Sequence, residues 1–193
     1  MANTYPNYTK NDFFHLENKY GIMAKNRAMD YQKAISSYKT LPTDKQLLTV
    51  NLYLNQLLSQ YDDIVQNQED HWATPKEFLL LGFGDCEDYV IIKYFSLIKL
   101  GFDKQRLYFT TVFETYSRSH HMVLSYFDES NKAPLILDNL SFRILRLDER
   151  KDLQADLFIN DSGVYKLKNN KLLKIKNHSK KFEELLLRVK EES

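Results

Sequence analysis

Residues 84 to 101 read Gly84-Asp85-Cys86-Glu87-Asp88-Tyr89-Val90-Ile91-Ile92-Lys93-Tyr94-Phe95-Ser96-Leu97-Ile98-Lys99-Leu100-Gly101. Apolar residues would lie all around a helix formed by this run, and Gly101 stands where helices commonly end. The pattern therefore predicts a helix that begins at Asp85 and is buried on most sides. Cys86 then lies in the first turn, where unpaired backbone N–H groups and the positive end of the helix dipole favour a thiolate.

The residues before this segment predict a helical first half. Apolar side chains recur there at helical spacing. The expected helices cover residues 12–19 and 24–38, followed by a third that opens at Pro42-Thr43 and runs on through Leu57 and Leu58. Thr74-Pro75-Lys76-Glu77 combines a capping residue, a proline for the first turn and a glutamate three residues after the cap. This signature predicts a short helix that ends before Gly82.

The residues after Gly101 have the texture of β-structure. Short β-branched and aromatic runs separated by turn residues predict strands at 107–115, 121–127, 134–137, 163–168 and 171–175. Ser179 is placed to cap a last amphipathic helix, Lys180 to Lys190. Helices first and an antiparallel sheet second make the fold class α+β. With no internal repeat and no linker-like stretch, we expect one domain over residues 1–193.

Composition excludes several classes of protein. The 193 residues carry 27 Lys+Arg against 26 Asp+Glu, a formal net charge of +1, which gives no global electrostatic reason to expect nucleic acid as a partner. A single cysteine excludes an intrachain disulfide and a cysteine-rich zinc site. No apolar run approaches the ~20 residues that span a bilayer. The N-terminus lacks the pattern of a secretory signal, which taken alone weakly favours the cytoplasm.

Cys86 is either an inert buried thiol or a reactive one. Free cysteine is among the most buried residue types, so the inert role is a real alternative. Gly82 and Gly84 are two of five glycines in the chain and lie within four residues of the sulfur. They leave its approach free of side chains, which favours reactivity.

A nucleophilic thiol needs a base, and histidine is the usual one. Of five histidines, the doublet His120-His121 lies at the start of a predicted strand. If that strand and the next form a hairpin centred between Glu129 and Ser130, His121 pairs with Asp138 on one face, and His120 points to the other. Asp138 could then orient the imidazole. A slip of one residue would offer Asn139 or Leu137 instead.

Three carboxylates surround Cys86, and their charge opposes ionisation of the thiol. Asp85 and Asp88 fit the two positions of a capping box, which is one explanation for them. The other is a hard divalent cation, most naturally Ca²⁺, held by the clustered oxygens of Asp85, Glu87 and Asp88. The chain has no Asp-x-Asp-x-Asp-Gly loop, so such a site would not be an EF-hand.

With these segments in order, the chain resembles the bacterial transglutaminase-like cysteine proteinases, and within them the LapG-type periplasmic proteases. The resemblance rests on three strings, Gly84-Asp85-Cys86-Glu87-Asp88-Tyr89, His121-Met122-Val123-Leu124 and Leu137-Asp138-Asn139-Leu140, with 35 residues from cysteine to histidine and 17 from histidine to aspartate. It implies a papain-like, transglutaminase-type fold and a Cys86, His121, Asp138 triad. It also implies calcium dependence, with Asp85 and Glu87 as the best-matched ligands and Asp88 as a further candidate.

The resemblance further implies a biological setting. Members of this group cut a large cell-surface adhesin near its N-terminus, typically between two alanines, and so release cells from biofilms. An inner-membrane receptor that binds cyclic di-GMP holds them in check. By this resemblance we expect a periplasmic protease that is not itself embedded in the membrane, with the adhesin as substrate and the receptor as partner.

Two other functions stay open on the sequence. The same triad could serve a transglutaminase or amidase acting on glutamine side chains, or the chain could be an inactive calcium-binding or receptor-docking module. A separate feature is a lysine-rich segment, residues 166 to 181, with seven lysines. It is either a solvated hairpin and helix start or a surface that docks an acidic stretch of substrate.

Overall fold

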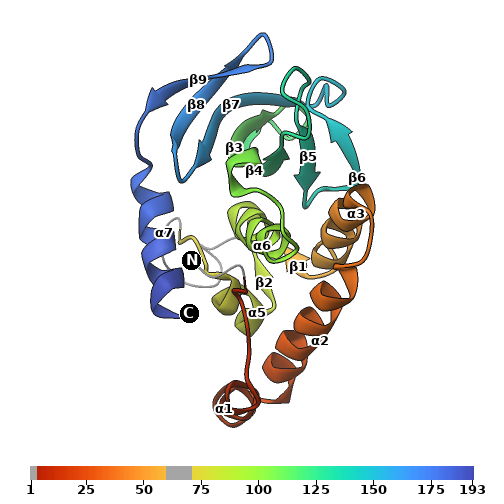
Figure 1. The fold of residues 1–193 in the computed structure, drawn as a ribbon, viewed down its shortest axis with the longest axis vertical. Coiled ribbons are helices and arrows are strands. Elements are labelled where there is room, and N and C mark those ends of the chain that lie inside the picture. The colour runs from red at the N-terminus through yellow and green to blue at the C-terminus, as the bar shows by residue number, and fades with distance from the viewer. Residues whose placement is uncertain (1–3, 60–70) are drawn as a thin grey trace.

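The structure is a computed structural model that describes residues 4–59 and 71–193 (Figure 1). It has the expected α+β architecture, with a layer of helices beneath an antiparallel sheet. Residues 1–3, where the N-terminal stretch begins, lie outside the described part. None of the described helices is both long and apolar enough to cross a membrane.

The first half of the chain is helical, as predicted. It contains α1 (Lys10–Tyr20), α2 (Ile22–Tyr38), α3 (Thr43–Leu54), α5 (Pro75–Leu81) and α6 (Cys86–Lys99). The hydroxyl of Thr74 accepts a hydrogen bond from the backbone N–H of Glu77, and the carboxylate of Glu77 accepts one from the backbone N–H of Thr74. The capping box before α5 is therefore confirmed. Gly82 ends α5 in the left-handed conformation, which a glycine adopts without strain.

The second half forms a seven-stranded antiparallel sheet with the strand order β6-β5-β4-β3-β7-β8-β9. Its strands are β3 (Leu107–Glu114), β4 (Ser119–Tyr126), β5 (Leu135–Asp138), β6 (Ser141–Arg146), β7 (Leu153–Asn160), β8 (Gly163–Lys168) and β9 (Lys171–Lys176). A short 3-10 helix, η1 (Lys104–Arg106), precedes β3. The chain then closes with α7 (Lys180–Glu191).

The helix α6 is the centre of the fold. An unbroken run on it, residues 88 to 97, is buried, as the apolar pattern predicts. Figure 1 shows the sheet curving over α6, with α3 to one side and α7 to the other. Phe182 of α7 packs edge-on against Phe109 of β3, with ring centroids 4.9 Å apart, and against Tyr94 of α6 at 6.0 Å. One hydrophobic core therefore joins both halves of the chain.

One predicted helix was too long, and two strands were missed. The third helix ends at Leu54, and Leu58 instead starts β1 (Leu58–Ser59), which pairs in parallel with β2 (Phe83–Gly84). The strands β6 and β7 were not predicted at all. Yet β7 lies in the middle of the sheet, where it pairs with both β3 and β8. The register between β3 and β7 shifts where Thr111 pairs with Leu157 and Val112 with Ala155, so one residue of β7 is skipped and the simple pattern of pairing is broken.

Candidate active site

Cys86 is the first residue of α6, as the sequence predicts. Asp85 caps the helix, and its side chain and that of Asp88 bond reciprocally to each other's backbone. Gly84 must be small, because a Cβ added there would meet Asp88 Oδ2 at 2.6 Å. The glycine therefore lets the chain pass close to the cap and leaves the half-buried thiol at the start of a helix.

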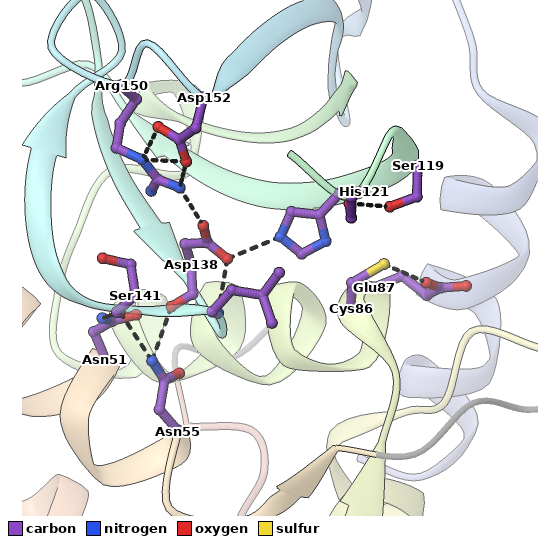
Figure 2. Close-up of polar contacts among 12 residues, drawn as sticks. Asn51, Asn55, Cys86, Glu87, Ser119, His121, Asp138, Ser141, Arg150 and Asp152 are labelled. Atoms are coloured by element: carbon purple, nitrogen blue, oxygen red, sulfur yellow. Dashed lines mark hydrogen bonds and ion pairs between the residues drawn. The ribbon is translucent and has the colours of Figure 1, made fainter. Parts of the chain in front are cut away.

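The thiol itself faces a carboxylate. Cys86 Sγ donates to Glu87 Oε2 over 3.2 Å (Figure 2). Burial, the charge and hydrogen bond of Glu87 and the charge of Asp85 together raise the pKa of Cys86 well above its usual range. The backbone N–H of Met122, the residue after His121, acts in the opposite direction. The start of α6 thus meets β4 at the predicted base, while burial and the neighbouring carboxylates oppose ionisation of the thiol.

His121 and Asp138 are in contact, as the hairpin argument predicts. The Nε2 of His121 and Oδ1 of Asp138 are 2.8 Å apart, and both side chains are buried. The predicted register was wrong by two residues, because β4 and β5 pair Leu124 with Leu137 and Ser125 with Ile136. A shift of two preserves the side of the sheet on which each residue lies, so the two side chains still share a face and meet diagonally.

The second histidine of the doublet lies on the other face of β4, as strand alternation predicts. His120 is exposed, and its ring packs edge-on against Phe113 with centroids 5.8 Å apart. Within residues 4–59 and 71–193, no carboxylate bonds to His120 in the way that Asp138 bonds to His121. The geometry therefore singles out His121 as the histidine that a carboxylate holds in place.

Asp138 is fixed from several directions that sequence reasoning did not find. Its Oδ1 accepts the backbone N–H of Leu140 at 2.9 Å, and its Oδ2 accepts Arg150 Nη2 at 2.8 Å. Asn55, just beyond α3, donates to the backbone carbonyl of Asp138 at 2.8 Å. Burial alone would raise the pKa of Asp138, but the bonds from His121, Leu140 and Arg150 outweigh it and hold the pKa below its usual range.

A cleft of about 700 Å³ opens over Cys86 and His121. Trp72 belongs both to the core and to the cleft wall: it is 7% exposed, its ring is tilted against that of Phe109 with centroids 5.6 Å apart, and it lines the cleft. The rest of the lining comes from β3, β4, β7, β8, β9 and residues 178–181. A chain of several residues fits a space of this size.

The three predicted metal ligands do not form one cluster. Both oxygens of Asp88 are engaged by backbone N–H groups, Oδ1 by Ala73 at 2.7 Å and Oδ2 by Asp85 at 3.4 Å. Across residues 4–59 and 71–193, no three His, Cys, Asp or Glu side chains are grouped so that they could hold a metal ion. The carboxylates of Asp85 and Glu87 still have the hard oxygen chemistry that Ca²⁺ prefers. The ligand assignment stays a prediction, and the geometry of Asp88 favours its capping role.

Comparisons with known proteins give the site its context. The family model for bacterial transglutaminase-like cysteine proteinases (BTLCP) matches residues 22–152. LapG of Legionella pneumophila in a calcium-bound structure is 32% identical, covers 94% of this chain and 99% of its own, and superposes with a TM-score of 0.77. An EGTA-treated structure of the same LapG gives a TM-score of 0.81 at 32% identity, over 95% of this chain and 99% of that one.

Comparison with curated proteins finds no match. The family model covers more than half of the chain and spans the cysteine, the histidine and the aspartate. The structural likeness to LapG extends over nearly the whole length of both chains. The protein therefore belongs to the bacterial transglutaminase-like cysteine proteinases and is a cysteine peptidase of papain-like fold.

Proposed function

We propose that the protein is a calcium-dependent cysteine endopeptidase with Cys86 as nucleophile, His121 as base and Asp138 as the group that orients the base. The observation that carries the proposal is that Cys86 and His121 line one cleft while the buried Asp138 bonds to the imidazole of His121. The start of α6 lies against β4 beside His121, and the imidazole lies between Asp138 and Cys86 (Figure 2). Membership of a cysteine proteinase family supports the same roles.

The hydrogen bond to Asp138 indicates which nitrogen of the base carries the proton. An ionised Asp138 accepts only, so the proton between it and His121 resides on Nε2, and Nδ1 is the nitrogen that takes up a proton. Since the thiol donates to Glu87 here, it must exchange that acceptor for His121 before reaction. The thiolate then attacks the peptide carbonyl, and the imidazolium protonates the leaving amine.

Release of the acyl enzyme uses the same residues. His121 accepts a proton from water, the resulting hydroxide attacks the thioester carbonyl, and the proton returns to the sulfur as the acid product leaves. Backbone N–H groups in the first turn of α6 would supply part of the oxyanion hole in both steps. The balanced outcome is hydrolysis of one peptide bond and regeneration of Cys86.

Calcium fits the electrostatics of the nucleophile. The charges of Glu87 and Asp85 raise the pKa of Cys86, so a cation held by these two carboxylates would offset the charges that oppose the thiolate. Backbone carbonyls and water commonly complete a calcium shell. The calcium-bound and EGTA-treated forms of the similar LapG support calcium binding here.

The substrate and setting follow from the family resemblance. We propose that the enzyme cuts the N-terminal region of a large cell-surface adhesin, between two alanines, in the periplasm, and that this cut releases cells from a biofilm. A cyclic-di-GMP receptor in the inner membrane is the proposed partner that sequesters the enzyme. The open cleft, which can take an extended chain, supports a protein substrate.

The test of the proposed function is cleavage of a recombinant adhesin N-terminal fragment, with product masses as the readout. We expect Cys86→Ala and His121→Asn each to lower kcat/KM by at least about 10³-fold, because each removes a group that acts in the chemical step. His120→Asn is the matched control from the same doublet and should change the rate less than about 10-fold.

Product masses also separate the alternatives. Hydrolysis gives two fragments that sum to the substrate plus one water, whereas a transglutaminase or amidase would leave the backbone intact and alter glutamine side chains. Cleavage that persists in Cys86→Ala, or fragments that never appear with the unmodified enzyme, would contradict the assignment. Circular dichroism of each variant establishes that it is folded.

A further inference from the structure

Apart from the triad, the lining of the cleft includes two chemically distinct sets of residues. We call the apolar set the floor; it comes from Trp72 with side chains of β7, β8 and β9, namely Leu157, Ile159, Val164 and Ile175. We call the basic set the rim; it comes from the end of β9 and the start of α7, namely Lys176, His178, Lys180 and Lys181. Both sets line the same cleft as Cys86.

The rim keeps cationic charge available to a ligand. His178 pairs with Glu183 at 2.8 Å and Lys180 with Glu184 at 3.5 Å, but all four groups are well exposed, so these pairs are weak. Lys176 is exposed and has no ion pair with an acidic side chain in the part of the chain that the structure describes. The acidic side chain that lines the same cleft is Glu87, which lies beside the sulfur.

The aromatic floor also holds one of the cations in place. The ammonium of Lys181 lies 5.6 Å from the centroid of the Trp72 ring, a cation–π distance. Trp72 is itself fixed by its contact with Phe109. Because the ammonium lies near an anchored ring, this side chain is already partly ordered before a substrate binds, which lowers the entropic cost of binding.

We propose that this rim, Lys176, His178, Lys180 and Lys181, binds an acidic side chain of the substrate while an apolar side chain of the same segment occupies the floor. The enzyme would then prefer peptide bonds that have Asp or Glu a few residues away, on one side of the cut. The inference rests on the proposed endopeptidase function and adds a substrate class to it. The rim belongs to the cleft that holds Cys86 and His121, so its occupant is the chain being cleaved.

The test is a cleavage profile on a library of proteome-derived peptides, read by mass spectrometry. The unmodified enzyme should enrich Asp or Glu at one position near the cut. The double variant Lys176→Glu/Lys180→Glu should lose that enrichment and gain Lys or Arg at the same position, because it reverses the charge of the rim. A glutamate at position 180 also suits the first turn of α7.

A matched control carries the same change of net charge elsewhere. Lys168→Glu/Lys171→Glu alters the turn between β8 and β9, away from the cleft lining, and should leave the profile unchanged. For one cleaved peptide and its Asp→Asn version, we expect kcat/KM to differ by roughly 2- to 5-fold with the unmodified enzyme, mostly through KM, and to differ little with the rim variant. Added salt should reduce the difference in kcat/KM that the unmodified enzyme shows between the two peptides.

The outcomes separate this inference from the function on which it rests. Cleavage that depends on Cys86 but shows no acidic preference would overturn the inference alone. A preference that survives charge reversal of the rim would do the same, because another surface would then read the acidic residue. Absence of any cleavage that depends on Cys86 would overturn the proposed function and this inference with it.

Discussion

Asp138 shows how a single residue is prepared for its role. A buried carboxylate is costly unless it is paired, and here every oxygen has a donor. His121 and Leu140 share Oδ1, and Arg150 takes Oδ2. Arg150 is 8% exposed and is held in turn by Asp152, with Nη2 2.6 Å from its Oδ2. Arg150 is therefore a positioning residue that keeps Asp138 ionised and aimed at His121.

Loss of Arg150 should be visible in the pH profile. We expect Arg150→Met to lower kcat about 10-fold or more and to move the acid limb of kcat/KM to higher pH. The acid limb should move to higher pH because Arg150 helps to hold the pKa of Asp138 down, and without Arg150 the carboxylate takes up a proton at higher pH. The variant should also lose roughly 3–5 kcal/mol of stability, as expected when one partner of a buried pair is removed.

The controls for Arg150 separate charge from folding. Arg150→Lys keeps the charge and should move the acid limb part of the way back to its original pH. The lysine cannot bond to Asp138 and Asp152 at once in the way that the guanidinium does. Asp152→Asn removes only the outer carboxylate and should leave the profile near that of the unmodified enzyme. An acid limb that stays in place in a folded Arg150→Met variant would show that Asp138 does not depend on Arg150.

Lys93 is a second buried cation in the same region. It is 1% exposed, its ammonium lies 5.7 Å from the centroid of the Tyr89 ring, and its Nζ has no hydrogen-bond partner within residues 4–59 and 71–193. Burial lowers the pKa of Lys93 to about 7, and the charge of Asp138 only partly opposes this. The lysine therefore destabilises the fold wherever the unfolded chain would be protonated.

Lys93→Met should stabilise the protein by an amount that depends on pH. Between about pH 10 and pH 7 the unfolded chain holds a proton on Lys93 that the folded protein does not, so the unmodified protein loses stability as pH falls, by more than about 1 kcal/mol per unit. Below about pH 7 both states are protonated and the penalty is constant. The gain in Lys93→Met should thus grow from pH 9 to pH 7 and then level off at a few kcal/mol.

Urea unfolding at pH 6, 7, 8 and 9 measures this gain. Lys45→Met on the exposed side of α3 is the control, and its stability difference should not vary with pH in the same way. A Lys93→Met variant that is less stable than the unmodified protein at pH 7 would mean that the buried ammonium has a stabilising partner.

At the scale of elements, the sequence predicts best where local chemistry is strong. The capping box at Thr74, the burial of α6 and the last helix from Lys180 all follow from side chains close to one another in the chain. The strand β7 was missed because its eight residues include Gln154, Asp156 and Asn160, and because its place beside β3 is fixed by pairing that is distant in sequence. Local patterns carry little information on such pairing.

The pairing of His121 with Asp138 could be predicted even though the predicted register of β4 and β5 was wrong. The register was wrong by two residues, but the period of a strand is two, so the shared face of His121 and Asp138 survived. A one-residue error would have separated them. Arg150 could not be found in this way, since it lies in a polar turn between β6 and β7 whose sequence resembles any solvated loop.

At the scale of the whole molecule, the site lies where the helical layer meets the sheet. Cys86 belongs to α6, whereas His121 and Asp138 belong to β4 and β5. Side chains of the helical layer fix this junction, since Asn51 and Asn55 donate to the carbonyl of Ser141 at 2.8 and 3.1 Å, just after Asp138. Because Cys86 is the first residue of α6 and α6 is the buried centre of the fold, a ligand that binds at the start of α6 should affect both the geometry of the site and the stability of the fold.

Calcium binding should raise the thermal stability of the whole protein as well as its activity. A ligand at 100 times its Kd that binds only the folded state adds about 2.7 kcal/mol, which for a chain of this size raises Tm by roughly 5–10 °C. We expect this rise when Ca²⁺ is added to EGTA-treated protein. Asp85→Asn and Glu87→Gln should abolish it, and asparagine still caps the helix at position 85. Asp156→Asn, on the exposed part of β7, should leave it unchanged.

Asp88→Asn then distinguishes the two roles of the third carboxylate. Because Asp88 bonds to the backbone of Ala73 and Asp85, we expect its replacement to lower Tm by a similar amount with and without Ca²⁺, and to preserve the difference between the two conditions. Loss of that difference would instead make Asp88 a ligand that changes partners when the ion binds. Full activity in excess EGTA, with no change of Tm on addition of Ca²⁺, would remove the ion from the proposed function.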